Sequence, residues 1–215
     1  MAGDGDPKTR IMAAAEELFA VRGYHGATTR EIASAAGMNL AMIHYYFGNK
    51  EGLYRTIFED KIERIRGIFA SAGAESGTCT ERLERVVRAY AEFLCSRPAF
   101  VRVMQHEMLA GGTLFSELFL PQVKRNYAAV RALFEEGIRR GEFRHVDVEI
   151  MPISMIGMMA FFLVGQPIVT GLLDTGPCDP GFANRLAEHT LNVLFSGLRA
   201  QQTGCPPGGG PEEPL

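Results

Sequence analysis

Apolar residues recur every three to four positions along most of this chain, which is the spacing of helices that bury one face. The first such segment has Asp6 and Pro7 at its start, where a capping residue and a first-turn proline belong, and Gly23 just after its end at Arg22. Its apolar face consists of Ile11, Ala15, Leu18 and Phe19. No run of useful length alternates with the period of two that marks a half-buried strand. The pattern predicts an all-α protein.

Two short helices joined by a tight turn are predicted between residues 28 and 47. Thr28 and Glu31 have the spacing of a capping box, which opens the first of them. Gly37 ends that helix, because the sharp turn needs a positive φ, and Asn39 caps the next one, which runs to about Phe47. The residues spaced to pack between these helices are Ile32, Ala33, Ala36 and Ile43. Three short helices followed by a long one form a helix-turn-helix head.

A long helix at about 50–70 is expected to connect this head to a helical body. Its apolar stripe consists of Leu53, Tyr54, Ile57, Phe58, Ile62, Ile65 and Phe69. Further amphipathic segments are predicted at about 81–96, 98–110, 122–140, 148–173 and 181–201. About nine helices result, with residues 1–50 as the helix-turn-helix domain and 51–202 as a ligand-binding and dimerisation domain. The tail, 203–215, is rich in Gly and Pro, and we expect it to be disordered.

Charge limits the kind of nucleic-acid contact that the chain can make. The formal net charge of −3 excludes a highly basic protein that coats nucleic acid. The first 50 residues carry as many acidic as basic side chains, so any DNA contact must come from a local patch.

Cysteines and the N-terminus bear on the compartment. Cys79, Cys95, Cys178 and Cys205 are scattered and lack the paired spacing of a zinc site, so we expect reduced thiols and no metal, with a redox sensor as the alternative. The N-terminus is polar and acidic, unlike a signal peptide. A cytoplasmic protein is expected.

Residues 28–54 resemble the TetR-type (tetracycline-repressor-like) transcriptional regulators. The resemblance covers roughly residues 8–55 and rests on Thr-Arg-Glu-Ile-Ala, Ala-Gly, Tyr-Tyr-Phe and Lys-Glu-x-Leu at matching intervals. It implies a homodimer whose two heads bind half-sites of a palindromic operator in double-stranded DNA. One departure is His44, where a tyrosine is commoner.

The helix-turn-helix pattern and the resemblance assign similar roles to the head. A helix N-terminus such as that at Thr28 and Thr29 favours a phosphate. The start of the third helix meets base edges, and apolar side chains there suit thymine methyl groups. Side chains later in the motif would bind phosphates and set the register. The expected DNA-binding residues are Thr28, Thr29, Arg30, Asn39, Leu40, Ala41, Met42, His44, Tyr45 and Lys50.

Residues 150–173 carry no charge and are long enough to span a bilayer. A membrane anchor is therefore the alternative reading of this chain. Against it, the flanking residues are mostly acidic, and Pro152, Gly157 and Pro167 interrupt the segment. We favour a helix buried on every side between the body and a partner subunit. The resemblance implies that 148–173 and 181–201 form the dimer interface.

Methionine and phenylalanine are concentrated in the body, and methionine adapts to irregular cavities. The alternatives are an ordinary helical core and a pocket for a small apolar effector of unknown identity. The candidate pocket residues are Met104, Met108, Phe119, Phe134, Met155, Met159 and Phe162.

An enzyme is the remaining class, and the sequence gives it little support. His106-Glu107 begins like a helical zinc-protease motif, but residue 110 is alanine where the second histidine would stand. No catalytic residue and no cofactor are predicted. We expect a transcriptional regulator, and on the resemblance a repressor that a small apolar effector releases from DNA.

Overall fold

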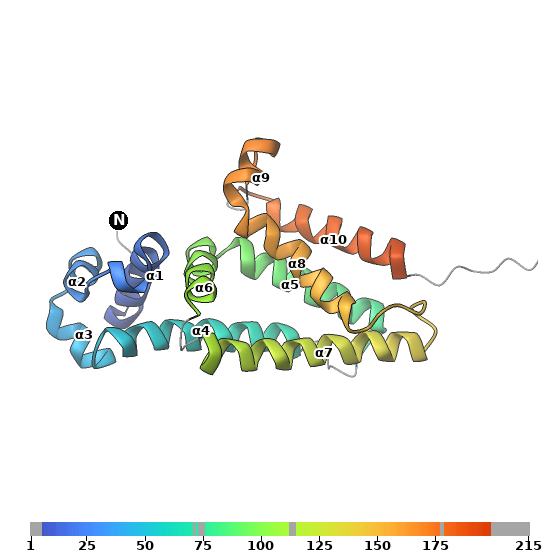
Figure 1. Cartoon of the computed structure of the whole chain (residues 1–215), viewed down its shortest axis with the longest axis horizontal. Coiled ribbons are helices and arrows are strands. Elements are labelled where there is room, and N and C mark those ends of the chain that lie inside the picture. The colour runs from blue at the N-terminus through green and yellow to red at the C-terminus, as the bar shows by residue number, and fades with distance from the viewer. Residues whose placement is uncertain (1–5, 71, 73–75, 112–114, 177–178, 199–215) are drawn as a thin grey trace, which may run out of the picture.

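The computed structural model describes residues 6–70, 72, 76–111, 115–176 and 179–198. These residues form helices and no strand, which confirms the all-α prediction. Figure 1 shows the head at one end and the body at the other. The helices are α1 (Pro7–Gly26), α2 (Thr29–Ala36), α3 (Leu40–Phe47), α4 (Lys50–Ala70), α5 (Cys79–Cys95), α6 (Pro98–Ala110), the π-helical η2 (Phe115–Phe119), α7 (Leu120–Arg139), α8 (Ile150–Val164), α9 (Gln166–Leu173) and α10 (Phe182–Leu198).

The turns of the head form as their capping residues predict. Thr28 Oγ1 accepts a hydrogen bond from the Glu31 backbone while the Glu31 carboxylate accepts one from the Thr28 N–H, which completes the capping box. Gly37 ends α2 with φ 65°, and the Asn39 side chain caps α3 by accepting from the Met42 N–H at 3.0 Å. Helix α1 differs from the prediction, since Asp6 stands at the capping position but its side chain forms no capping hydrogen bond.

Gly23 interrupts α1 rather than ending it. Its φ of 68° and ψ of 175° are non-helical, and helical turns resume as far as Gly26. The kink lets the end of α1 bend toward α4, where the Tyr24 and Tyr54 rings lie 4.7 Å apart between centroids.

Helix α4 connects the head to the body (Figure 1). Its first turns pack on α1 and α3, and the rest of it lies beside α5 and α7. Most of the predicted stripe is buried, and Ile62 is half-buried. Helix α6 stands between the head and the body and packs against α1, while α5 packs against α10.

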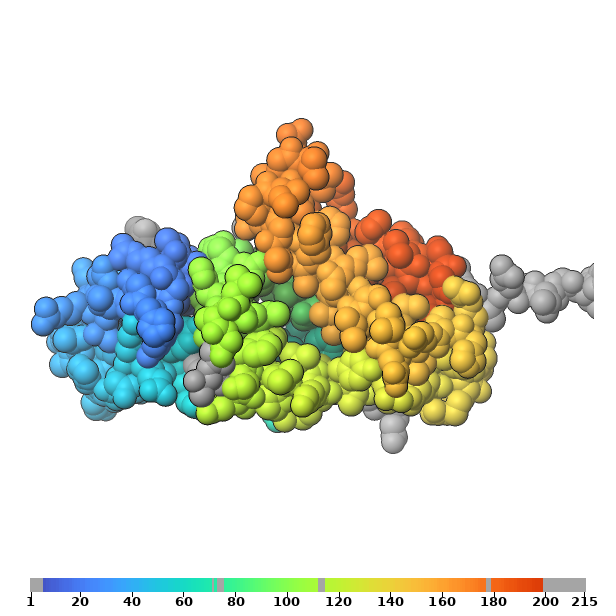
Figure 2. Space-filling model, in the orientation of Figure 1, coloured from blue at the N-terminus to red at the C-terminus, as the bar shows by residue number. Residues whose placement is uncertain are grey.

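The uncharged segment differs from the expected single helix. It consists of α8 and α9, which are bent by 77° at a break occupied by Gly165. Among the described residues no single helix is long and apolar enough to cross a membrane, and this bent pair passes the length and composition test only together. Helix α9 projects from the body as a ridge (Figure 2).

The segment is also not buried on every side of one chain. Phe161 is 57% exposed and Leu172 is 76% exposed. Both belong to a set of exposed apolar residues that includes Ile150, Ile153, Val164, Ile168, Leu173 and Val193 of α10. The segment is therefore buried on one side only in the single chain, and these apolar side chains are open to a partner subunit.

Two described cysteines, Cys79 and Cys95, are buried at the two ends of α5, which begins two residues before the segment predicted at about 81–96. Burial raises the pKa of the Cys79 thiol, which disfavours the reactive thiolate. Cys178, Cys205 and the tail at 203–215 lie outside the described residues. The domain boundary at residue 50 stays a prediction.

Candidate DNA interface and effector cavity

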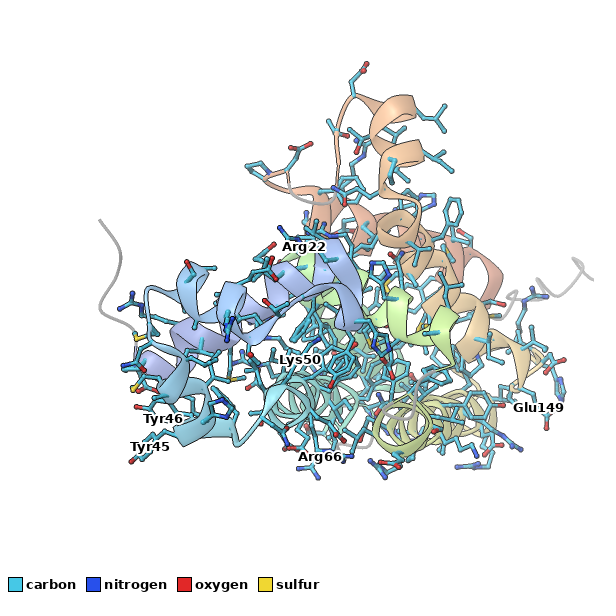
Figure 3. The ribbon with its side chains drawn as sticks, turned by 60° about the vertical axis from the view of Figure 1, so that its left-hand side comes forward. Arg22, Tyr45, Tyr46, Lys50, Arg66 and Glu149 are labelled. Carbon is cyan, nitrogen blue, oxygen red and sulfur yellow. The ribbon has the colours of Figure 1, made fainter. Side chains whose placement is uncertain are left out.

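Helix α3 carries the most exposed aromatic side chain of the head. Tyr45 is 79% exposed and packs edge-on against the half-buried Tyr46. Figure 3 shows both at the outer edge of the head. Ile43 and Phe47, on the opposite face of α3, are buried and anchor the helix. Helix α3 therefore packs on the rest of the head with one face and exposes the other face to solvent.

The start of α3 presents small and apolar groups. Ala41 is exposed, and Leu40 and Met42 are half-buried. Asn39 is exposed, but its side-chain oxygen is already used in the cap of α3. These four residues lie on consecutive positions before the aromatic pair, as the expected base-contacting residues should.

At the start of α2, Arg30 has the freedom to reach DNA. It is exposed and forms no ion pair within the described residues. Thr28 differs, because its hydroxyl donates to Glu31 Oε2 at 2.7 Å as well as accepting in the capping box. Those bonds, with the Arg22 ion pair, hold the pKa of the Glu31 carboxyl below its usual range. Thr29 is half-buried beside it.

Lys50 and His44 are less free than the sequence indicates. The Lys50 ammonium lies 4.4 Å from the centroid of the Tyr24 ring, and partial burial lowers its pKa. Figure 3 shows Lys50 well inside the edge marked by Tyr45. The His44 ring nitrogen Nδ1 lies 2.8 Å from the Gly48 carbonyl oxygen. Both residues therefore stabilise the head in addition to any contact with DNA.

A cavity of about 270 Å³ opens in the body between α4, α5, α6, α7 and α8. Its walls are apolar apart from the amides of Gln105, Gln122 and Asn126 and the Tyr90 hydroxyl. The apolar lining residues are Ile62, Ile65, Phe69, Phe93, Leu94, Phe100, Val101, Met104, Met108, Phe119, Val123, Ile156, Ala160 and Val164. A small apolar cavity with a few polar groups is the usual form of a small-molecule site.

Three of the seven candidate pocket residues line this cavity, namely Met104, Met108 and Phe119. Phe134, Met155 and Met159 do not; they are fully buried and belong to the packed core. Phe162 lies beside a different hollow with Leu173 and Phe182. Residue type alone could not separate these groups, because a methionine on a helix face looks the same in a core and in a cavity wall.

The polar residues of the cavity were not among the residues predicted from the sequence. Gln122 and Asn126 stand four residues apart on α7 and are both buried. Buried amides on the apolar face of an amphipathic helix are unusual, and that placement was the available signal. Gln105 and Tyr90 are half-buried and gave no such signal.

Helix α6 links the cavity to the head. Met104 and Met108 of α6 line the cavity, and the same helix packs against α1. The Phe100 and Phe58 rings pack edge to face, with 5.7 Å between their centroids, and join α6 to α4.

Two family models match this chain. Residues 11–57 match the bacterial regulatory proteins of the tetR family, and residues 76–162 match the tetracyclin repressor-like C-terminal domain. The chain belongs to the tetR family. As a tetR-family protein it is a helix-turn-helix transcriptional regulator rather than an enzyme, and it binds operator DNA as a dimer and responds to a small molecule.

Relatives of this tetR-family regulator match along nearly its whole length. The HTH-type transcriptional regulator YdgC of Bacillus subtilis is 27% identical, over 90% of this chain and 93% of that protein. The regulator PfmR of Thermus thermophilus superposes with a TM-score of 0.73 at 23% identity, over 89% of this chain and all of that one. The regulator FadR of Bacillus subtilis, solved with stearoyl-CoA, gives 0.67 at 23% identity, over 88% and 98%. These structures share the fold.

Proposed function

We propose that this regulator is a cytoplasmic repressor, and that a small apolar molecule in the body cavity lowers its affinity for a palindromic operator. The observation that carries this proposal is the position of α6. One helix contributes side chains to the cavity wall and packs on α1 of the DNA-binding head. A ligand that moves α6 therefore moves the head.

The head would contact DNA through the exposed face of α3 and the start of α2. Ala41, Leu40 and Met42 would meet base edges, while Tyr45 and Arg30 would bind phosphates. Its uncharged base-contacting residues suit thymine methyl groups rather than hydrogen-bonded readout. Thr28, Asn39, His44 and Lys50 are also expected contacts, and each has a role in the structure of the head as well. Thr29 is the remaining expected contact and is half-buried.

The dimer would form through α8, α9 and α10. These helices carry exposed apolar side chains that a second copy of the chain would cover. A symmetric dimer places the two heads at a fixed separation, and a palindromic operator with one half-site spacing follows from that symmetry.

The effector would occupy the cavity and act through α4 and α6. FadR, which shares this fold, was solved with stearoyl-CoA, a molecule with a long apolar chain. The walls of the present cavity are mostly apolar, so an apolar ligand suits them as well. The coupling required is modest, because about 1–3 kcal/mol changes operator affinity roughly 5- to 150-fold.

Selection of bound sequences from a random DNA duplex library tests the DNA-binding part of this proposal. The full-length protein should enrich a palindrome, and a footprint on the natural promoter beside its own gene should contain it. Enrichment of unrelated sequences, or of single half-sites with no symmetry, would contradict the proposal.

A further inference from the structure

Among the described residues that line the cavity in the body, none carries a charged side chain. Each of its lining residues is apolar, aromatic, an amide or a hydroxyl. An ionised group placed there would lose its hydration and find no partner of opposite charge, which is a large cost. The portion of a ligand inside the cavity is therefore neutral.

Three polar residues of α7 form a chain of hydrogen bonds with a fixed direction. Arg125 donates to Gln122 Oε1 from Nε at 3.2 Å and from a terminal nitrogen at 2.7 Å. A guanidinium has no acceptor, so the Gln122 oxygen must face Arg125. The Gln122 amide nitrogen then donates to Asn126 Oδ1 at 2.6 Å. The exposed arginine thus sets the orientation of both buried amides.

This direction leaves the nitrogen end of Asn126 without a partner. Asn126 is only 7% exposed and lines the cavity, and its Nδ2 donates no hydrogen bond within the described part of the chain. A donor on the wall of a largely apolar cavity gains free energy when a bound molecule offers it an acceptor.

Tyr90 adds a second polar group at the cavity wall. Burial raises its pKa to about 12, so its hydroxyl keeps its proton at neutral pH. Its ring packs edge-on against Phe69. Tyr90 and Asn126 therefore both offer neutral donors at the cavity wall.

We propose that the effector is a neutral, largely apolar molecule with a carbonyl or ether oxygen that accepts a hydrogen bond from Asn126 Nδ2. Arg125 acts as a positioning residue, because it keeps the Asn126 donor turned toward the ligand. This inference rests on the proposed function, since it names the class of molecule that the cavity of the regulator takes.

A matched ligand series tests the inference on the full-length dimer without DNA. Calorimetry would compare a methyl ketone of about ten carbons, the alkane of equal length and the carboxylate of equal length. We expect the ketone to bind at least tenfold more tightly than the carboxylate at neutral pH, because only the carboxylate buries a charge. The ratio of ketone to alkane affinity should fall about tenfold in Asn126→Leu.

Arg125→Met gives a second test that does not alter the cavity wall. Without the guanidinium the two amides can reverse, so the ketone-to-alkane ratio should fall several-fold. Arg131→Met is the matched control, because Arg131 is a half-buried residue of α7 that pairs with Glu135 and not with Gln122. Its ratio should equal that of the wild type.

Tighter binding of the carboxylate, or an unchanged ratio in both Asn126→Leu and Arg125→Met, would overturn the inference and leave the DNA-binding proposal intact. Absence of binding by all three compounds, in a protein that still binds its operator, would also overturn it. Loss of operator binding by the wild type is a separate result, which contradicts the proposed function itself.

Discussion

The hydroxyl of Tyr54 donates a hydrogen bond to Glu107 Oε2 at 3.0 Å, and so ties the connecting helix α4 to α6. The other oxygen of Glu107 accepts from the Phe115 N–H at 3.2 Å. Burial, followed by the Glu107 charge, raises the pKa of Tyr54, so the hydroxyl remains a donor at any physiological pH. Tyr54 also packs edge-on against Phe19 of α1 at 4.8 Å. Tyr54 of the connecting helix therefore contacts both α1 of the head and α6.

Removing this hydroxyl should weaken the communication between the cavity and the head. Tyr54→Phe keeps the ring and leaves one oxygen of the buried Glu107 without its donor, at a cost of about 1–3 kcal/mol in the free energy of unfolding. We expect a lower melting temperature and a smaller effect of the effector on operator affinity. Tyr127→Phe, which removes an exposed hydroxyl bonded to the Glu149 carbonyl, is the control and should change neither. If the effector changed operator affinity equally in Tyr54→Phe and in the wild type, this contact would not transmit ligand binding to the head.

Tyr45→Ala should weaken operator binding without loss of stability. The side chain is largely exposed, so its removal deletes a phosphate contact and little packing. We expect affinity to fall about tenfold for the operator and for unrelated DNA alike. Leu109→Ala, at a similarly exposed position on α6, should bind as the wild type does. A mobility-shift titration measures both variants, and wild-type affinity in Tyr45→Ala would remove α3 from the interface.

Lys50→Met separates two roles of one ammonium group. If Lys50 binds a phosphate, the slope of log affinity against log salt should fall by about one. The loss of its contact with the Tyr24 ring should also lower stability modestly, by about 0.5–1 kcal/mol. Operator titrations at several salt concentrations give the slope. A lower melting temperature with an unchanged slope would restrict Lys50 to its structural contact.

Phe161→Glu should separate the dimer and leave the chain folded. The side chain is exposed in the single chain, so a charge there disturbs only an interface with a second copy. We expect elution as a monomer, unchanged helical content by circular dichroism and loss of tight operator binding. Val21→Glu places the same charge at an exposed apolar position of the head and should remain dimeric. A dimeric Phe161→Glu protein would place the interface elsewhere.

The α2 capping box should contribute a pH-dependent part of the stability. Because hydrogen bonds from Thr28 and the Arg22 charge lower the folded pKa of Glu31, its contribution is complete above the unfolded value of about 4.3. It is lost as the pH falls through the lower folded value. As the pH falls from the unfolded to the folded pKa of Glu31, the free energy of unfolding should therefore decline less steeply in Glu31→Gln than in the wild type. Denaturation as a function of pH measures this, with the exposed Glu59→Gln as a charge-matched control that keeps the steeper decline.

Signals from residues close together in the sequence predicted most of the fold. The capping pairs, the positive-φ glycine at 37 and the 3.6-residue stripes depend on neighbours in sequence, so they predicted the limits of α2 and α3 and the course of α4. The break at Gly165 was missed because an uncharged run looks alike whether it is straight or bent by 77°. The cavity depends on the distance between helices far apart in sequence. For that reason Met104 and Met155 could not be told apart before the structure placed one on the wall and one in the core.

Reciprocal linkage is the most direct test of the central claim, that occupancy of the cavity and binding of the operator oppose each other. Calorimetry would measure the affinity of a cavity ligand for the dimer with and without saturating operator DNA. Operator DNA should weaken ligand binding by the same factor, roughly 5- to 150-fold, by which the ligand weakens operator binding. Equal ligand affinities in the two titrations, for every compound shown to occupy the cavity, would contradict it.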